Sequence, residues 1–142
     1  MIKYVTGFML SPDYKQVALI TKNKPSWQAN KLNGIGGKIE SGETPSEAMA
    51  REFEEETGVI TSPNEWVKFV VLIRESDYEV NFFYLVSEKV FGVVTKEDEE
   101  VSIYDVANLP ENAIFNLKWL IPLSTDKKIN FKNPIIISDH TY

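Results

Sequence analysis

The segment of residues 36–59, GGKIESGETPSEAMAREFEEETGV, constrains the fold of this chain more than any other stretch. It predicts a helix over residues 45–57, because Thr44 is placed as the N-cap and Glu47 as its partner in a capping box. A proline stands at the first helical position, where its missing N–H is tolerated. Gly58 is placed to end the helix in a left-handed conformation. The sequence therefore predicts one helix with defined ends.

The side chains of this helix divide into three stripes at about 100° per residue. An apolar stripe that could pack on a sheet consists of Met49, Ala50, Phe53 and Thr57. Glu52, Glu55 and Glu56 share a second face, because the i, i+3 and i+4 spacings place them on neighbouring turns. Glu47 and Glu54 are expected to point elsewhere, into solvent.

This acidic face of Glu52, Glu55 and Glu56 has two interpretations. A run of charge is most often a solvated surface, but an exposed helix usually alternates glutamates with basic residues at i+4. Here only Arg51 offers that spacing, at the edge of the face. Three carboxylates in one patch repel one another unless a cation neutralises them, and Mg²⁺ prefers such oxygen ligands. Three glycines before the helix would let a backbone carbonyl or a ligand approach closely; they are Gly34, Gly36 and Gly37.

Together these residues resemble the Nudix box, the signature of the Nudix (MutT-like) hydrolases. Its pattern is G-x5-E-x7-R-E-U-x-E-E-x-G-U, where U is an apolar residue, and residues 37–59 fill every fixed position. Phe53 stands where an aliphatic residue is commoner, and it still suits a core contact. The resemblance implies the Nudix α/β/α sandwich, an α/β (α+β) fold with a mixed sheet, in a single domain of residues 1–142.

The resemblance also implies hydrolysis of a nucleoside diphosphate linked to another group, with Mg²⁺ or Mn²⁺ required. By position, the metal ligands would be the Gly37 carbonyl, Glu52, Glu55 and Glu56. Glu52 would act as general base, and Arg51 would pair with Glu43 and orient the glutamates. A purely structural role for that pair, in pinning the loop to the helix, is equally consistent. The family often uses one more glutamate, and the candidates are Glu97, Glu99 and Glu100, together with Asp98, with Glu100 weakly favoured.

Residues outside the box bear on the substrate. The stretch KLNGIGGK resembles the segment of MutT-like and oxidised-purine nucleoside triphosphate hydrolases in which an asparagine contacts the base, here Asn33; a simple turn residue is the alternative. NLKWLIPL resembles a late segment in which a polar side chain faces the base, here Asn116. Trp119 would either line the pocket or belong to the core. Lysines that would meet phosphates, or only solvate the surface, are Lys38, Lys22, Lys24 and Lys31.

We therefore expect a Mg²⁺-dependent pyrophosphohydrolase that converts a (deoxy)nucleoside triphosphate, such as 8-oxo-dGTP, into the monophosphate and pyrophosphate. One alternative is a hydrolase of ADP-ribose or of a dinucleoside polyphosphate. Another is a non-catalytic, nucleotide-sensing Nudix module, although such modules usually lack box glutamates and none is missing here.

The remaining elements are predicted from alternation and turn chemistry. Strands are expected at residues 2–10, 17–22, 35–39, 65–73, 79–86 and 100–104, the first two as a hairpin. Residues 22–34 should form a loop, and residues 116–123 a short helix before an irregular tail.

Composition narrows the class of protein. The net charge of −6 argues against binding to a nucleic acid polymer, and no apolar run is long enough to span a membrane. The chain has no cysteine, and its single histidine, His140, is near the end, so thiolate sites and histidine triads are discounted. We expect a cytoplasmic protein that takes a small nucleotide, with a homodimer left open.

Overall fold

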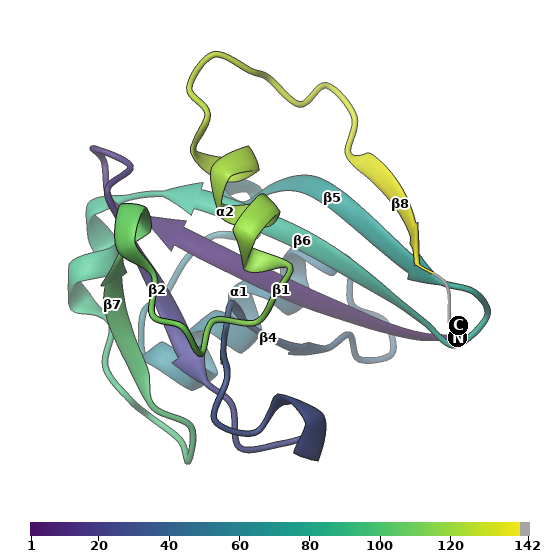
Figure 1. The fold of residues 1–142 in the computed structure, drawn as a ribbon. Coiled ribbons are helices and arrows are strands. Elements are labelled where there is room, and N and C mark those ends of the chain that lie inside the picture. Colours follow the sequence, from purple (N-terminus) through teal and green to yellow (C-terminus); the bar gives the residue numbers. More distant parts are fainter. Residues whose placement is uncertain (140–142) are drawn as a thin grey trace.

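The computed structural model describes residues 1–139 and consists of one eight-stranded mixed sheet between two helices (Figure 1). The strands are β1 (Ile2–Leu10), β2 (Gln16–Thr21), β3 (Leu32–Asn33), β4 (Ile35–Lys38), β5 (Val67–Arg74), β6 (Tyr78–Val86), β7 (Val101–Asp105) and β8 (Ile135–Asp139). The helices are α1 (Pro45–Thr57) and α2 (Leu117–Thr125). Short 3₁₀ turns occupy Ser26–Gln28, Pro63–Glu65, Glu88–Gly92 and Val106–Asn108.

Strand β1 organises the sheet. It runs parallel to β6 along its whole length, and its other edge pairs with β4 from Tyr4 to Gly7. It meets β2 only at the register Leu10–Val17. The hairpin expected from the sequence is therefore short, because β2 turns away to pair with β3 and β7. This divergence opens a place for β4, which carries the glycines of the box.

A hydrophobic core lies on each face of the sheet, since the sheet is covered by α1 behind and α2 in front in the view of Figure 1. On the α1 side, Phe53 packs against Trp66 with ring centroids 5.2 Å apart. On the α2 side, Leu117, Leu120 and Ile121 are buried. The α/β/α sandwich expected from the resemblance is confirmed.

Most predicted elements are present with ends shifted by up to two residues, and the helix at residues 45–57 matches in full. The prediction of an irregular tail was wrong, because β8 pairs in parallel with β5. The loop at residues 22–34 also contains β3, which pairs with β2. Both strands are short segments whose hydrogen-bond partners lie far away in the sequence. None of the helices among residues 1–139 is long and apolar enough to cross a membrane.

Candidate active site

Helix α1 begins and ends as its sequence requires. The Thr44 hydroxyl accepts a hydrogen bond from the Glu47 backbone N–H at 3.2 Å, and the Glu47 carboxylate accepts one from the Thr44 N–H at 2.8 Å. Gly58 follows the last turn with φ of 77°, in the left-handed region. With Met49 and Phe53 buried against the sheet, these ends fix the direction in which the acidic face points.

The Arg51 guanidinium links the loop before α1 to the acidic face. Its Nε and Nη2 donate to the two carboxylate oxygens of Glu43 at 2.6 and 2.9 Å, a bidentate ion pair. Nη2 also donates to the Lys38 carbonyl at 3.0 Å, and Nη1 donates to Glu52 Oε1 at 2.9 Å. Nη1 lies 3.3 Å from an oxygen of Glu55. Hydrogen bonding within the bidentate pair lowers the pKa of Glu43 and raises the pKa of Arg51, so both groups stay charged.

Glu52 lies against β4 at Gly37. A Cβ atom at residue 37 would stand only 2.5 Å from Glu52 Cδ, so a side chain there would displace the carboxylate. The Glu52 side chain is 13% exposed. Its burial raises the pKa of the carboxyl above its ordinary value, although the Arg51 hydrogen bond acts in the opposite direction. A carboxylate of raised basicity is thus held between the helix and the glycine-containing strand.

Glu56 carries an unsatisfied buried atom. Its Oε2 is buried and has no hydrogen-bond partner among the described residues. Burial raises the pKa of Glu56 to about 7, and the negative charges of Glu97, Glu99 and Glu52 add to this effect. A buried acceptor among like charges is costly unless a proton or a cation neutralises it.

The acids at residues 97–100 behave differently from one another. Glu99 is buried, and it accepts hydrogen bonds from the Asn23 backbone N–H at 2.6 Å and from Lys22 Nζ at 3.0 Å. Burial alone would raise its pKa, but these bonds outweigh burial and lower it. Glu97 is exposed, and its charge nevertheless acts on Glu56. Glu100, the acid that the sequence weakly favoured, has an exposed side chain, and its backbone carbonyl pairs with the Thr21 N–H.

The oxygen-rich face fits a hard cation. Within residues 1–139, no three Asp, Glu, His or Cys side chains stand in an arrangement that could hold a metal ion as they are. Glu55 is turned towards Arg51 and its side chain is 48% exposed. However, the buried Glu56 Oε2 lacks a partner among the described residues, and the absent side chain at Gly37 lets the Glu52 carboxylate lie against the backbone of β4. The available donors are oxygens, the ligands that Mg²⁺ and Mn²⁺ prefer.

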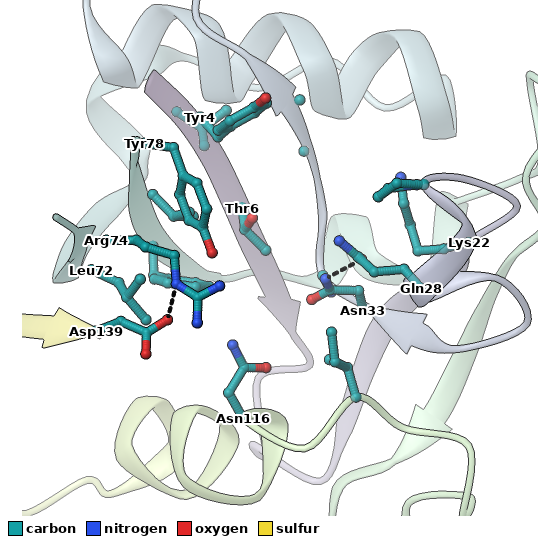
Figure 2. A pocket seen from close by; sticks show the side chains of 18 of the residues that line it. Tyr4, Thr6, Lys22, Gln28, Asn33, Leu72, Arg74, Tyr78, Asn116 and Asp139 are labelled. Atoms are coloured by element: carbon teal, nitrogen blue, oxygen red, sulfur yellow. Dashed lines mark hydrogen bonds and ion pairs between the residues drawn. The ribbon is translucent and has the colours of Figure 1, made fainter. Parts of the chain in front are cut away.

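A pocket of about 780 Å³ adjoins this face. Gly36 and Gly37 of β4 line it, as do Asn33 and Asn116. Asn33 donates from Nδ2 to Gln28 Oε1 at 3.1 Å, and its Oδ1 accepts the Gly34 N–H at 2.8 Å. Asn116 is the N-cap residue of α2, but its side chain makes no capping hydrogen bond, and its Oδ1 is buried without a partner among residues 1–139. Figure 2 shows the Asn116 amide pointing into the cavity.

Two residues expected to bind substrate do not line the pocket. Lys38 is exposed, does not line the pocket, and takes part through its carbonyl, which accepts from Arg51. Trp119 packs against the α2-side core instead of the pocket. For Trp119 this is the alternative expected from the sequence, a core aromatic, whereas a contact of Lys38 with phosphates at the acidic face stays a prediction. The lining does include Lys22 and the exposed Trp27.

Four residues that line the pocket were not expected from the sequence. Arg74 and Tyr78 of the β5–β6 turn and Asp139 of β8 line it, with Thr6 of β1. Figure 2 labels all four around the same cavity as Asn116, although they come from segments far apart in the chain. No sequence motif links these residues, and only the unexpected pairing of β5 with β8 brings Asp139 to Arg74.

Known proteins are similar to this chain over most of its length. A model of the NUDIX domain family matches residues 3–126. An uncharacterized Nudix hydrolase of Bacillus subtilis is 32% identical over 118 residues, which cover 77% of this chain and 72% of that protein. An 8-oxo-dGTP diphosphatase of Haemophilus influenzae is 29% identical over 96 residues, which cover 68% of this chain and 71% of that protein. With the 8-oxo-dGTP diphosphatase of Escherichia coli, identity reaches 61% over 31 residues, 22% of this chain and 24% of that one.

Solved structures share the fold at lower identity. A MutT protein from Bacillus halodurans superposes with a TM-score of 0.69 at 18% identity, covering 99% of this chain and 90% of that chain. A MutT NUDIX hydrolase from Burkholderia pseudomallei superposes with a TM-score of 0.69 at 16% identity, covering 85% of this chain and 95% of that chain. At such identities the comparison supports the fold alone.

Proposed function

This chain is a hydrolase of the Nudix family, and we propose that it is a divalent-cation-dependent pyrophosphohydrolase that converts a (deoxy)nucleoside triphosphate into the monophosphate and pyrophosphate. One observation carries the proposal: a single pocket joins Gly37, beside Glu52 of the acidic face, to Asn33 and Asn116. A ligand with its phosphates at the acidic face would therefore extend its base into the pocket. The names of two relatives, both 8-oxo-dGTP diphosphatases, support an oxidised purine such as that of 8-oxo-dGTP.

We assign the cation, Mg²⁺ or Mn²⁺, to Glu52, Glu55, Glu56 and the Gly37 carbonyl. The unpartnered Glu56 Oε2 and the close approach of the Glu52 carboxylate to the Gly37 backbone support this assignment. When bound, such a cation would neutralise phosphate charge, which otherwise repels a hydroxide-like nucleophile. Glu55 would have to turn from Arg51 to join the set, and its exposed position leaves room for that rotation.

The chain's own groups would orient and deprotonate the water. Glu52 is the proposed general base, since burial makes its carboxylate more basic and a base works best when its pKa approaches the working pH. Arg51 holds Glu52 Oε1 and is itself held by Glu43, so it limits the rotation of the base. Glu43 and Arg51 would then act by positioning, without touching the substrate.

Base recognition would fall to two amides. Asn116 presents a buried, unpartnered Oδ1, which could accept a base N–H. Asn33 is already engaged by Gln28 and Gly34, so a base would have to share or replace these bonds. For Asn33→Ala we expect a changed preference among bases with little loss of overall rate; an unchanged profile would remove Asn33 from the base site.

The decisive experiment is a Mg²⁺-supported screen with products identified by mass. The substrates are the ordinary nucleoside triphosphates, 8-oxo-dGTP, ADP-ribose and dinucleoside polyphosphates. We expect a nucleoside monophosphate and pyrophosphate from a triphosphate, most rapidly from the oxidised purine. Selective cleavage of ADP-ribose or a dinucleotide would overturn the substrate proposal while leaving the hydrolase assignment intact.

Three further properties follow from a nucleotide substrate or from the fold. Nucleoside triphosphates are metabolites of the cytoplasm, so we propose that location. The described residues share one sheet, so we propose that residues 1–142, including His140 to Tyr142 outside the described part, belong to one domain. The pocket and the acidic face both consist of residues of this chain, so in a homodimer, which the sequence leaves open, each copy would hold its own site.

A further inference from the structure

The lining of the pocket includes an ion pair that lies partly outside the family match. Arg74 Nε stands 3.0 Å from Asp139 Oδ2, and the two residues are register partners on β5 and β8. Strand β8 follows residue 126, where the NUDIX model ends. Their side chains are 33% and 37% exposed, so the pair lines the cavity and can be reached from it.

The groups around this pair offer hydrogen bonds of both kinds without a net charge. The Arg74 guanidinium lies over the Tyr78 ring at 5.9 Å from its centroid, which leaves donors of its planar fork for the cavity. Asp139 supplies acceptors, and the nearby Asn116 has a buried Oδ1 without a partner in the described part of the chain. Figure 2 shows the side chains of Arg74, Asp139 and Asn116 pointing towards the same space.

We propose that Arg74 and Asp139 form a charge-balanced subsite that selects a neutral, carbonyl-bearing purine base, such as guanine or its 8-oxo form, over a base that is ionised. This inference rests on the proposed function, because it takes the phosphates to lie at the acidic face and the base at the opposite end. Arg74 donates to the purine carbonyl oxygen, and the acceptors of Asp139 and Asn116 face the ring N–H groups. Asp139 is the specificity-determining residue, since its charge cancels that of Arg74.

Because the charges of Arg74 and Asp139 cancel, variants of the pair should rank in their affinity for an ionised base according to the net charge of the subsite. Arg74→Gln leaves a net negative subsite, and wild type and the Arg74→Gln/Asp139→Asn double variant are neutral. Asp139→Asn leaves Arg74 uncompensated and therefore positive. An anionic base should bind worst to Arg74→Gln, equally to wild type and the double variant, and best to Asp139→Asn. The reason is that like charges repel in a partly desolvated pocket.

The test uses guanosine and xanthosine monophosphates as probes at slightly alkaline pH, where xanthine is ionised and guanine is not. Their affinities are measured by calorimetric titration for the four proteins without metal, and kcat/KM is measured for the two triphosphates with Mg²⁺. Relative to wild type, Asp139→Asn should shift the affinity ratio towards xanthosine monophosphate by on the order of tenfold, and the double variant should return it. Asp77→Asn, which removes an exposed carboxylate from the neighbouring turn, is the matched control and should leave the ratio unchanged.

The outcomes separate the two proposals. A ratio that is the same in all four proteins, or a shift equal to that of Asp77→Asn, overturns the subsite, as does failure of wild type to bind guanosine monophosphate. A ranked ratio in the binding experiment, with no hydrolysis of any triphosphate, upholds the subsite and overturns the proposed reaction. If Asp139→Asn does not fold, Arg74→Gln against the double variant tests the same charge difference.

Discussion

Arg51 decides how the carboxylates of α1 are arranged. One guanidinium contacts Glu43, Glu52 and Glu55 and also holds the Lys38 carbonyl. The planar fork makes this possible, because it directs several donors at fixed angles. Its hydrogen bond to Glu43 raises the pKa of Arg51 most, and its contact with Glu52 adds to this effect. Glu56 Oε2 has no hydrogen-bond partner among the described residues, so we propose that this carboxylate depends most on a cation.

For Glu55→Gln and Glu56→Gln, we expect turnover with Mg²⁺ to fall about a hundredfold or more, because several kcal/mol of charge stabilisation is lost. Steady-state rates at saturating substrate measure this loss, and circular dichroism checks that the fold remains. Glu54→Gln is the matched control, since Glu54 is exposed on the same helix. Wild-type turnover in both variants would rule out the metal assignment.

Glu99 gives a pH-dependent contribution to stability. Its pKa is lowered in the folded protein, so its contribution is present above the unfolded pKa and is lost as the pH falls through the folded value. We therefore expect Glu99→Gln to lower Tm by about 3–6 °C at neutral pH, with the difference disappearing in acid. Thermal unfolding between neutral and acidic pH measures it. Glu100→Gln removes the same charge from an exposed neighbour and should leave Tm nearly unchanged at every pH.

At the scale of elements, the site depends on how closely α1 approaches β4. The missing side chain at Gly37 lets the Glu52 carboxylate lie against the strand. Gly36 has a similar restriction, since its Cβ would overlap the Val5 carbonyl across the β1–β4 pair. Two neighbouring glycines thus serve two different contacts, one with a side chain and one with a backbone.

Gly37→Ala should disturb the contact with the Glu52 side chain and leave the backbone contact at Gly36 in place. The new methyl group would push the Glu52 carboxylate from its position, so we expect kcat to fall at least tenfold with a Tm loss of only a few degrees. Gly92→Ala is the control, because its Cβ would meet Val59 at 3.9 Å, an ordinary contact. Equal activity of the two variants would show that Glu52 does not need this position.

At the scale of the whole molecule, β8 closes the sheet next to the pocket. It covers the open edge of β5, and the preceding Phe131 packs against Phe69 and Tyr84 with ring centroids 5.7 and 6.4 Å away. The acidic face lies on α1, and Asp139 lies on β8, which pairs with β5. In our two proposals, chemistry and base selection therefore depend on separate parts of the fold.

A chain that ends at residue 133 should separate these functions. We expect it to remain folded with a lower Tm, because Phe131 stays and one edge strand is lost, and to keep cleaving triphosphates. Its preference for guanine over xanthine nucleotides should weaken, because Asp139 is gone. Loss of all activity in a folded, truncated protein would contradict this division, and thermal unfolding with parallel kinetics measures both effects.

The sequence by itself determined helix α1, its caps and the grouping of Glu52, Glu55 and Glu56, because these depend on residues within a few positions of one another. The pairing of Arg51 with Glu43 could also be anticipated, since the box places both on one short loop and helix. The positions of the Lys38 and Trp119 side chains relative to the pocket could not be predicted from the sequence. The direction of a side chain at a strand end or on a short helix depends on what packs against it.

Only the tertiary structure decided where the pocket ends. Arg74, Asp139 and Asn116 are separated by long stretches of chain, and they meet because β8 pairs with β5 and α2 crosses the same face of the sheet. The choice of Glu99 over Glu100 as the buried acid likewise depends on where Lys22 and Asn23 lie. Local patterns specify local geometry, whereas burial, charge partners and cavity walls arise from contacts that no short segment contains.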